Sequence, residues 1–158
     1  MTDPNIHIRP VEPADADQWL ALRIALWPDE DPHLMAEDVK SFFGHADQRS
    51  ETSLEAVLVA MDRRAGRLVG FAELSRRAYA EGCETSPVGF LEGWYVAAEY
   101  RQQGVGGALV ASAEAWARSL GCQEFASDAV AENTLSAVAH KALGFEDVGL
   151  IRCFRKSL

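Results

Sequence analysis

The first half of the chain changes its hydrophobic period several times, and each change predicts a new element. Alternation of apolar and polar residues is typical of a strand, whereas apolar residues three and four positions apart indicate a helix. Prolines and polar clusters separate these segments. The pattern predicts a strand at 6–11, a helix from Asp15 or Asp17 to about Leu26, a helix at 33–43, and strands at 55–61 and 68–76.

The second half is organised around one apolar segment, 88–96, which predicts a central strand. The elements expected after it are a helix at 108–120 ended by Gly121, a strand at 124–127, a helix at 134–143 that Asn133 can cap, and a last strand at 148–155. The order of elements predicts an α+β fold (an α/β mixed sheet) with helices flanking the sheet. We expect a single domain over residues 1–158.

The composition of the chain indicates where in the cell we expect the protein and whether it binds a metal. No apolar run approaches the ~20 residues that a membrane-spanning helix needs. The first residues lack the basic and apolar regions of a signal peptide, so we expect a cytoplasmic protein that makes no use of a membrane. Three scattered cysteines, Cys83, Cys122 and Cys153, have neither disulfide-framework nor metal-ligand spacing, and no metal is expected.

The net charge of −9 changes the expected partners. It argues against nucleic acid, because the phosphates would be repelled. It favours a cationic small molecule or a basic peptide as the ligand. Many soluble proteins are acidic for solubility alone, so the charge by itself does not decide between these interpretations.

The glycine-rich segment 101–107 lies between the predicted central strand and the helix after it. Such a turn places backbone N–H groups in one concavity, at the positive end of the helix dipole. Glycine also lets the backbone approach a phosphate closely. With Arg101 beside it, the turn predicts a diphosphate-containing cofactor rather than a turn that needs glycine for its geometry alone.

Several motifs together resemble a known superfamily over essentially the whole chain. The Arg101-x-x-Gly104-x-Gly106 turn, Asn133 and Leu143-Gly144-Phe145 are similar to those of the GCN5-related N-acetyltransferases (GNAT). Within that superfamily, the strings at 84–93, 125–128 and 132–134 resemble the aminoglycoside 6′-N-acetyltransferases. Trp27 and Tyr79 fit the same resemblance.

The resemblance implies acetyl-CoA as the co-substrate and assigns residues to it. The strand before the turn is expected to carry a bulge, and its backbone is expected to take the pantetheine, with the N–H of Val96 polarising the thioester carbonyl. Asn133 is expected to form a hydrogen bond to the pantetheine arm. Judged from the local sequence alone, Asn133 is a helix N-cap. Trp94 and Tyr95 point to opposite faces of their strand, so we expect one of the two side chains to pack in the core. The expected cofactor-binding residues are Trp94, Tyr95, Val96, Arg101, Gln102, Gln103, Gly104, Val105, Gly106, Gly107 and Asn133.

The resemblance also implies a substrate site for an aminoglycoside. Asp128 would bind the 6′-ammonium and accept its proton, although a carboxylate stabilises the charged amine and so explains binding better than base strength. Glu92 interrupts an apolar strand and would bind another amine or hydroxyl, while Trp27 and Tyr79 would cover a sugar ring or amine. His140 stands where many members have a tyrosine that protonates the departing thiolate. Gly149 replaces a glutamate that related enzymes often carry.

Two alternatives to an aminoglycoside acetyltransferase follow from the same motifs. The first alternative is an acetyltransferase for another amine, such as a protein N-terminus, lysine or polyamine. The second is an acyl-CoA-binding sensor without turnover. Members that resemble this subfamily are commonly dimers, and we expect a homodimer in which the strand at 148–155 is exchanged or pairs at an edge.

Overall fold

The computed structural model describes residue 3 and residues 5–44 and 54–158. Residues 1, 2 and 4, on which part of the signal-peptide expectation rests, lie outside this range. The strands are β1 (Ile6–Pro10), β2 (Ala56–Asp62), β3 (Arg67–Arg77), β4 (Val88–Val96) and β5 (Phe125–Ser127). The α-helices are α1 (Ala16–Leu26), α2 (Pro32–Phe42), α3 (Val105–Ser119) and α4 (Thr134–Ala142), and the short 3₁₀ turns are η1 (Pro13–Asp15) and η3 (Ala98–Tyr100).

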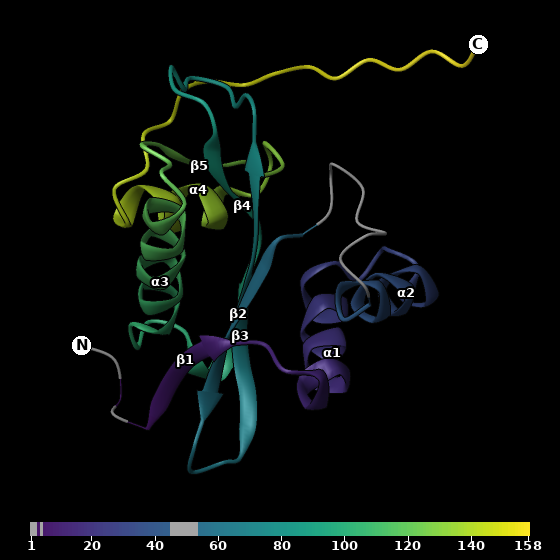
Figure 1. Cartoon of the computed structure of the whole chain (residues 1–158), viewed down its shortest axis with the longest axis vertical. Helices are drawn as coiled ribbons and strands as arrows, with labels where there is room; N and C mark the ends of the chain where they lie inside the picture. The colour runs from purple at the N-terminus through teal and green to yellow at the C-terminus, as the bar shows by residue number, and fades with distance from the viewer. Residues whose placement is uncertain (1–2, 4, 45–53) are drawn as a thin grey trace.

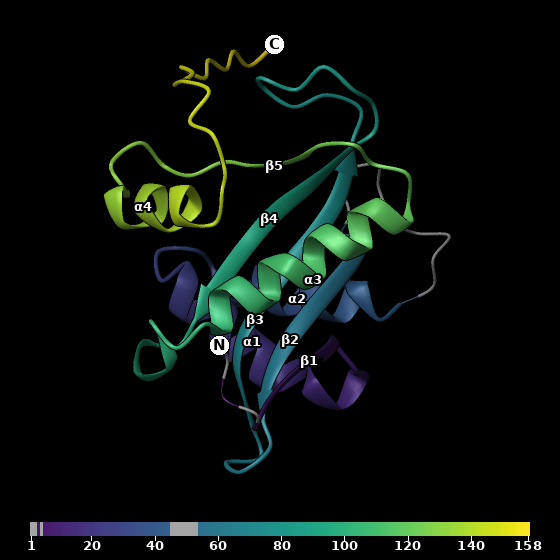
Figure 2. The ribbon, with the colours of Figure 1, turned by 90° about the vertical axis from the view of Figure 1, so that its left-hand side faces the viewer.

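The strands form one five-stranded sheet in the order β1-β2-β3-β4-β5. The first four run antiparallel to their neighbours, and β5 pairs parallel with β4, so the sheet is mixed as predicted. α1 and α2 lie on one face and α3 on the other (Figure 1). Figure 2 shows α3 running across its face of the sheet. Among the described residues, no helix is long and apolar enough to span a bilayer.

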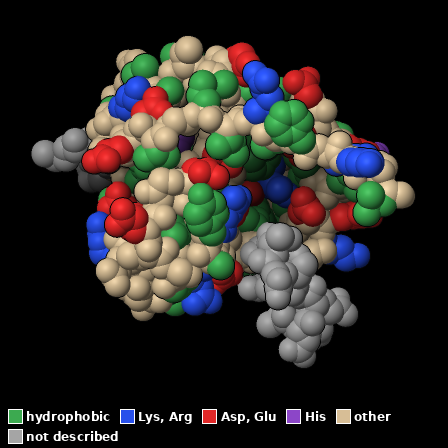
Figure 3. Space-filling view, turned by 90° about the horizontal axis from the view of Figure 1, so that it is seen from above, with side chains coloured by type: hydrophobic (Ala, Val, Ile, Leu, Met, Phe, Trp, Pro, Cys, Tyr) green, Lys and Arg blue, Asp and Glu red, His purple; other side chains and the backbone are tan. Residues whose placement is uncertain are grey.

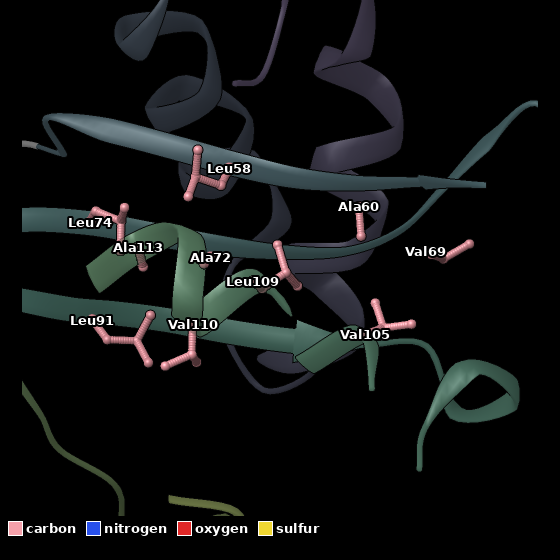
Figure 4. Close-up of a cluster of buried hydrophobic side chains, with 10 residues drawn as sticks. All are labelled: Leu58, Ala60, Val69, Ala72, Leu74, Leu91, Val105, Leu109, Val110 and Ala113. Atoms are coloured by element: carbon pink, nitrogen blue, oxygen red, sulfur yellow. The ribbon is translucent and has the colours of Figure 1, made fainter. Parts of the chain in front are cut away.

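Each face of the sheet has its own core. On one side, α3 contributes Val105, Leu109, Val110 and Ala113, which pack against β2, β3 and β4 (Figure 4). On the other side, fully buried Trp19 of α1 packs with Phe71 of β3 and with Val39 of α2. Because successive side chains of a strand point to opposite faces, β3 supplies Ala72 and Leu74 to the first core and Phe71 to the second.

β4 contains a bulge that the site depends on. Glu73 of β3 pairs with Gly93, and the next residue, Leu74, pairs with Leu91, which leaves Glu92 without a partner in the ladder. On its other side, β4 pairs with β5 only from Gly89 to Leu91. Beyond Leu91 the two strands part, so the backbone of the last five residues of β4 is open on that side. An extra residue of this kind re-aims the side chain that it carries.

The expected last strand at 148–155 does not form. The segment has no regular secondary structure and runs away from the domain, with Leu150 and Phe154 more than four-fifths exposed (Figure 1). Its apolar residues make it able to form a strand, but a strand is stable only against a partner strand. Within the described chain it pairs with no sheet edge. The other expected elements are confirmed, except that α3 begins earlier than predicted, at Val105.

Candidate active site

The glycine-rich turn has the backbone geometry of an anion cradle. Gly104 has a φ of 81° and Gln102 a φ of 60°, both in the left-handed region. α3 begins directly after the turn, and Ala108 donates to the carbonyl of Gly104 at 3.0 Å. The N–H groups of the first helical turn therefore precede this bond and point out of the helix end. This arrangement fits the diphosphate of a CoA substrate.

Close packing explains a second glycine of the turn. A Cβ on Gly106 would lie 2.9 Å from Cζ2 of Trp94, whereas a Cβ on Gly107 would meet Leu143 at an ordinary 3.4 Å. Only a residue without a side chain lets α3 come this near the indole. Nε1 of Trp94 is buried and has no hydrogen-bond partner among the described residues. This orphaned donor at the open end of β4 also fits a polar ligand in the cleft.

Two residues predicted to bind the diphosphate, Gln103 through its backbone amide and Arg101 beside the turn, brace the turn with their side chains. Nε of Arg101 donates to the carbonyl of Val96 at 2.8 Å, and its guanidinium carbon lies 5.4 Å from the ring centroid of Tyr95. Nε2 of Gln103 donates to the carbonyl of Glu99 at 2.7 Å. The first bond ties the turn to the end of β4 and the second ties it to η3, so the strand end and the start of the helix are held together.

α4 carries the two polar residues predicted to face the CoA arm. Oδ1 of Asn133 accepts from the N–H of Ser136 at 3.0 Å, which confirms the N-cap. Nδ1 of His140 lies 2.7 Å from the carbonyl of Ser136, and Nε2 lies 2.9 Å from Oγ of Ser127. A carbonyl can only accept, so Nδ1 carries a proton, whereas Oγ of Ser127 donates to the carbonyl of Leu91 at 3.2 Å and turns a lone pair toward Nε2. His140 can then donate from Nε2 only as the imidazolium.

Glu92 is held in an ion pair that the sequence did not predict. Its Oε1 accepts from Ser75 and from Nε of Arg77, the latter at 3.0 Å, and its Oε2 accepts from Nη2 of Arg77 at 2.7 Å. Both partners belong to β3, the strand next to β4. Asp128 directly follows β5, is exposed, and makes no hydrogen bond or ion pair with any described residue. Its carboxylate is therefore available to a cationic ligand.

The two predicted aromatic residues differ in their surroundings. Trp27 caps α1 and packs against Phe71 at 6.3 Å between ring centroids, and its Cζ2 and Cη2 face the position where Gly93 has no side chain. It therefore lies beside the bulge at Glu92. Tyr79 is 64% exposed in the loop after β3, where its hydroxyl donates to Glu81 at 3.0 Å. No contact among the described residues joins Tyr79 to the carboxylates of the site.

A buried charged group next to Trp27 was missed by the sequence analysis. Glu73 is 2% exposed, accepts from Nε1 of Trp19 at 2.9 Å, and has Arg23 Nε at 2.9 Å from its Oε1. The Arg23 guanidinium carbon also lies 5.3 Å from the ring centroid of Trp27. Burial raises the pKa of Glu73 to about 7, against the opposing effects of Arg23 and Trp19. The signal was present, because Glu73 interrupts an apolar strand as Glu92 does.

The site thus has two sides separated by β4. The cofactor features lie on the face of α3, whereas Trp27, Glu73, Glu92 and Arg77 lie toward α1, with Asp128 at the end of the adjoining strand. Acidic and basic side chains surround a hollow in the upper face of the molecule (Figure 3). A thioester entering between the parting strands β4 and β5 would meet an amine held from the other face.

This architecture is that of a known family. The profile of the acetyltransferase (GNAT) family matches residues 16–145. The chain belongs to this family. The GNAT assignment confirms the fold expected from the motifs, and it accounts for the glycine turn at the start of α3.

Similar proteins narrow the relationship further. An aminoglycoside N(6′)-acetyltransferase type 1 of Klebsiella aerogenes is 48% identical, covering 96% of each chain. A protein of the same name from Stenotrophomonas maltophilia is 43% identical over 96% of this chain and 93% of its own. The solved aminoglycoside acetyltransferase AAC(6′)-Iy with the bisubstrate analogue CoA-S-monomethyl-acetylneamine has a TM-score of 0.85 at 35% identity, covering 97% of this chain and 99% of the other.

Proposed function

We propose that this chain transfers the acetyl group of acetyl-CoA to the 6′-amino group of aminoglycosides, as one acetyltransferase domain over residues 1–158. The observation that carries the proposal is the free carboxylate of Asp128 at the mouth between β4 and β5, in a chain 48% identical to a named aminoglycoside N(6′)-acetyltransferase. Such a transfer would confer resistance, because it removes a cationic amine and adds bulk to the drug.

The residues of the site divide the reaction between them. The N–H groups at the start of α3 hold the diphosphate, and the open backbone of β4 holds the pantetheine with the N–H of Val96 toward the thioester carbonyl. Asp128 binds the ammonium and takes its proton as the amine attacks. The new C–N bond forms as the C–S bond breaks, the second proton that the nitrogen loses passes to solvent, and the departing thiolate takes a proton from the imidazolium of His140. Trp27, Tyr79 and Glu92 bind the rest of the substrate.

Release of the CoA thiol, followed with tobramycin or kanamycin as acceptor, tests the proposal. Release should require the drug, and Asp128→Asn should lower kcat/KM by roughly 10²–10⁴-fold. Asp17→Asn is the matched control, since this exposed aspartate on α1 lies outside the site and its loss should leave the rate unchanged.

The outcomes separate the alternatives. Drug-dependent release that survives in Asp128→Asn would remove Asp128 from the mechanism and keep the activity. Binding of acetyl-CoA without release for any aminoglycoside would overturn the proposed function, in favour of another amine acceptor or of a sensor without turnover.

A homodimer is the assembly that we propose, built by exchange of the segment 148–158. In the single chain this segment leaves Leu150, Ile151 and Phe154 between 68% and 88% exposed. β5 is an edge strand, and beside it lies a hollow of about 290 Å³ whose lining includes Glu81, Glu114, Glu124 and Glu146. The segment carries the opposite charge, on Arg152, Arg155 and Lys156.

The expected cytoplasmic location stays a prediction.

A further inference from the structure

Arg77 is a positive charge at the substrate side of the sheet that the proposed reaction does not use. It is the last residue of β3, and its Nε and Nη2 grip the two oxygens of Glu92 at 3.0 Å and 2.7 Å. A guanidinium that bonds both oxygens in this way makes a stronger and more directional pair than a single contact. Both carboxylate oxygens of Glu92 are therefore already paired with a cation of the protein itself.

The position of Arg77 is fixed by a second contact. Its guanidinium carbon lies 3.5 Å from the ring centroid of Phe90, the residue two positions before Glu92 on β4. The pKa of Arg77 is raised by its hydrogen bond to Glu92 and further by the charges of Glu92 and Asp128, against the effect of burial. Arg77 thus acts electrostatically on both carboxylates assigned to the substrate.

The pair is also open to exchange with a ligand. The side chain of Arg77 is 41% exposed and that of Glu92 24% exposed, so solvent reaches both. Solvent screens the attraction within a partly exposed pair, so an ammonium ion can compete with Arg77 for Glu92. Neighbouring Arg76 faces the other way and pairs with Glu55 at 2.8 Å, away from the site.

We propose that Arg77 is a specificity-determining residue, an internal cation that a substrate ammonium must displace from Glu92. The proposal rests on the aminoglycoside activity proposed above. While Arg77 occupies Glu92, an ammonium at that position binds at a penalty, whereas a hydroxyl can accept from or donate to the pair without breaking it. The site then discriminates among aminoglycosides by the charge that they carry beside the reacting amine.

Steady-state acetyl transfer with Arg77→Met tests this inference, because methionine keeps an apolar stem over Phe90 and removes the charge. KM for kanamycin should fall about three- to tenfold. In the background Glu92→Gln, the same change should have a smaller effect on KM, because only the electrostatic influence of Arg77 on Asp128 is left to remove. Arg76→Met is the matched control, with the same loss of charge one residue away, and its KM should stay within about twofold of native.

A pair of substrates tests the specificity directly. Kanamycin B carries an amine where kanamycin A carries a hydroxyl, on the ring that bears the 6′-amine. Arg77→Met should improve kcat/KM for kanamycin B more than for kanamycin A. A raised or unchanged KM in Arg77→Met, or equal gains for the two drugs, would overturn the inference while native turnover still supports the proposed function. Absence of native turnover with either drug would overturn both.

Discussion

At the scale of single residues, the acidic groups of the site differ in what surrounds them. Asp128 is exposed and forms no ion pair with a described residue, Glu92 forms a partly exposed ion pair with Arg77, and Glu73 is buried beside Arg23. Removing a carboxylate from water favours its neutral form, and burial accordingly raises the pKa of Glu73 to about 7. The buried pair lies against Trp27 beside the bulge, so Glu73 positions the ring that we propose faces the substrate.

This raised pKa gives stability a definite dependence on pH. The folded chain binds the proton of Glu73 more tightly than the unfolded chain, so the associated stability is present below about pH 4.5 and is lost as pH rises to about 7. As the pH rises from 5 to 8, the free energy of unfolding of the native protein should therefore fall relative to that of Glu73→Gln. Denaturant titration of both proteins across this pH range measures the difference. Glu55→Gln, at a partly exposed pair, should follow the native curve. Parallel curves for native and Glu73→Gln would contradict the assignment.

At the scale of elements, the start of α3 decides how the cofactor side is built. Gly106 and Gly107 are neighbours in one helical turn, but a side chain at Gly106 would press on Trp94 and one at Gly107 would not. Gly106→Ala should weaken CoA binding about tenfold or more, since overpacking costs roughly 1–3 kcal/mol. Gly107→Ala should bind CoA as the native chain does and gain up to about 1 kcal/mol of stability. Calorimetric titration with CoA and thermal unfolding of both variants measure this, and equal losses of affinity would contradict it.

The elements also show what the sequence can and cannot predict. Periodicity and caps located the strands and helices around the site, because those signals are local: Asn133 caps α4 in the structure as the sequence indicates. The family resemblance implied a bulge in this strand, but local patterns could not place it at Glu92, since its position depends on the register between β3 and β4. The Arg77–Glu92 and Arg23–Glu73 pairs were missed for the same reason, because each joins residues far apart in the chain. The strand at 148–155 failed because strand formation needs a partner.

At the scale of the whole molecule, the C-terminal segment is the part that the single chain leaves unpaired. A chain that ends at Asp147 should fold, because both cores lie within the sheet and the helices that precede it. It should be a monomer by analytical ultracentrifugation, whereas the full chain should have twice the mass of one chain. Phe154→Ser should shift the full chain toward monomer, with Ser157→Ala as the control. A truncated chain that stays dimeric would rule out exchange of this segment.

The two-sided sheet has a consequence for how such an enzyme changes over time. In the proposed reaction, donor and acceptor bind on opposite faces of β4, where Trp94 belongs to the core under α3 and Trp27 to the core under α1. A mutation that alters which drug is accepted falls among side chains that α3 never packs against, so it leaves the apparatus for the shared donor intact. Antibiotic range can therefore drift by single substitutions, while the half of the protein common to all substrates stays under unchanged constraint.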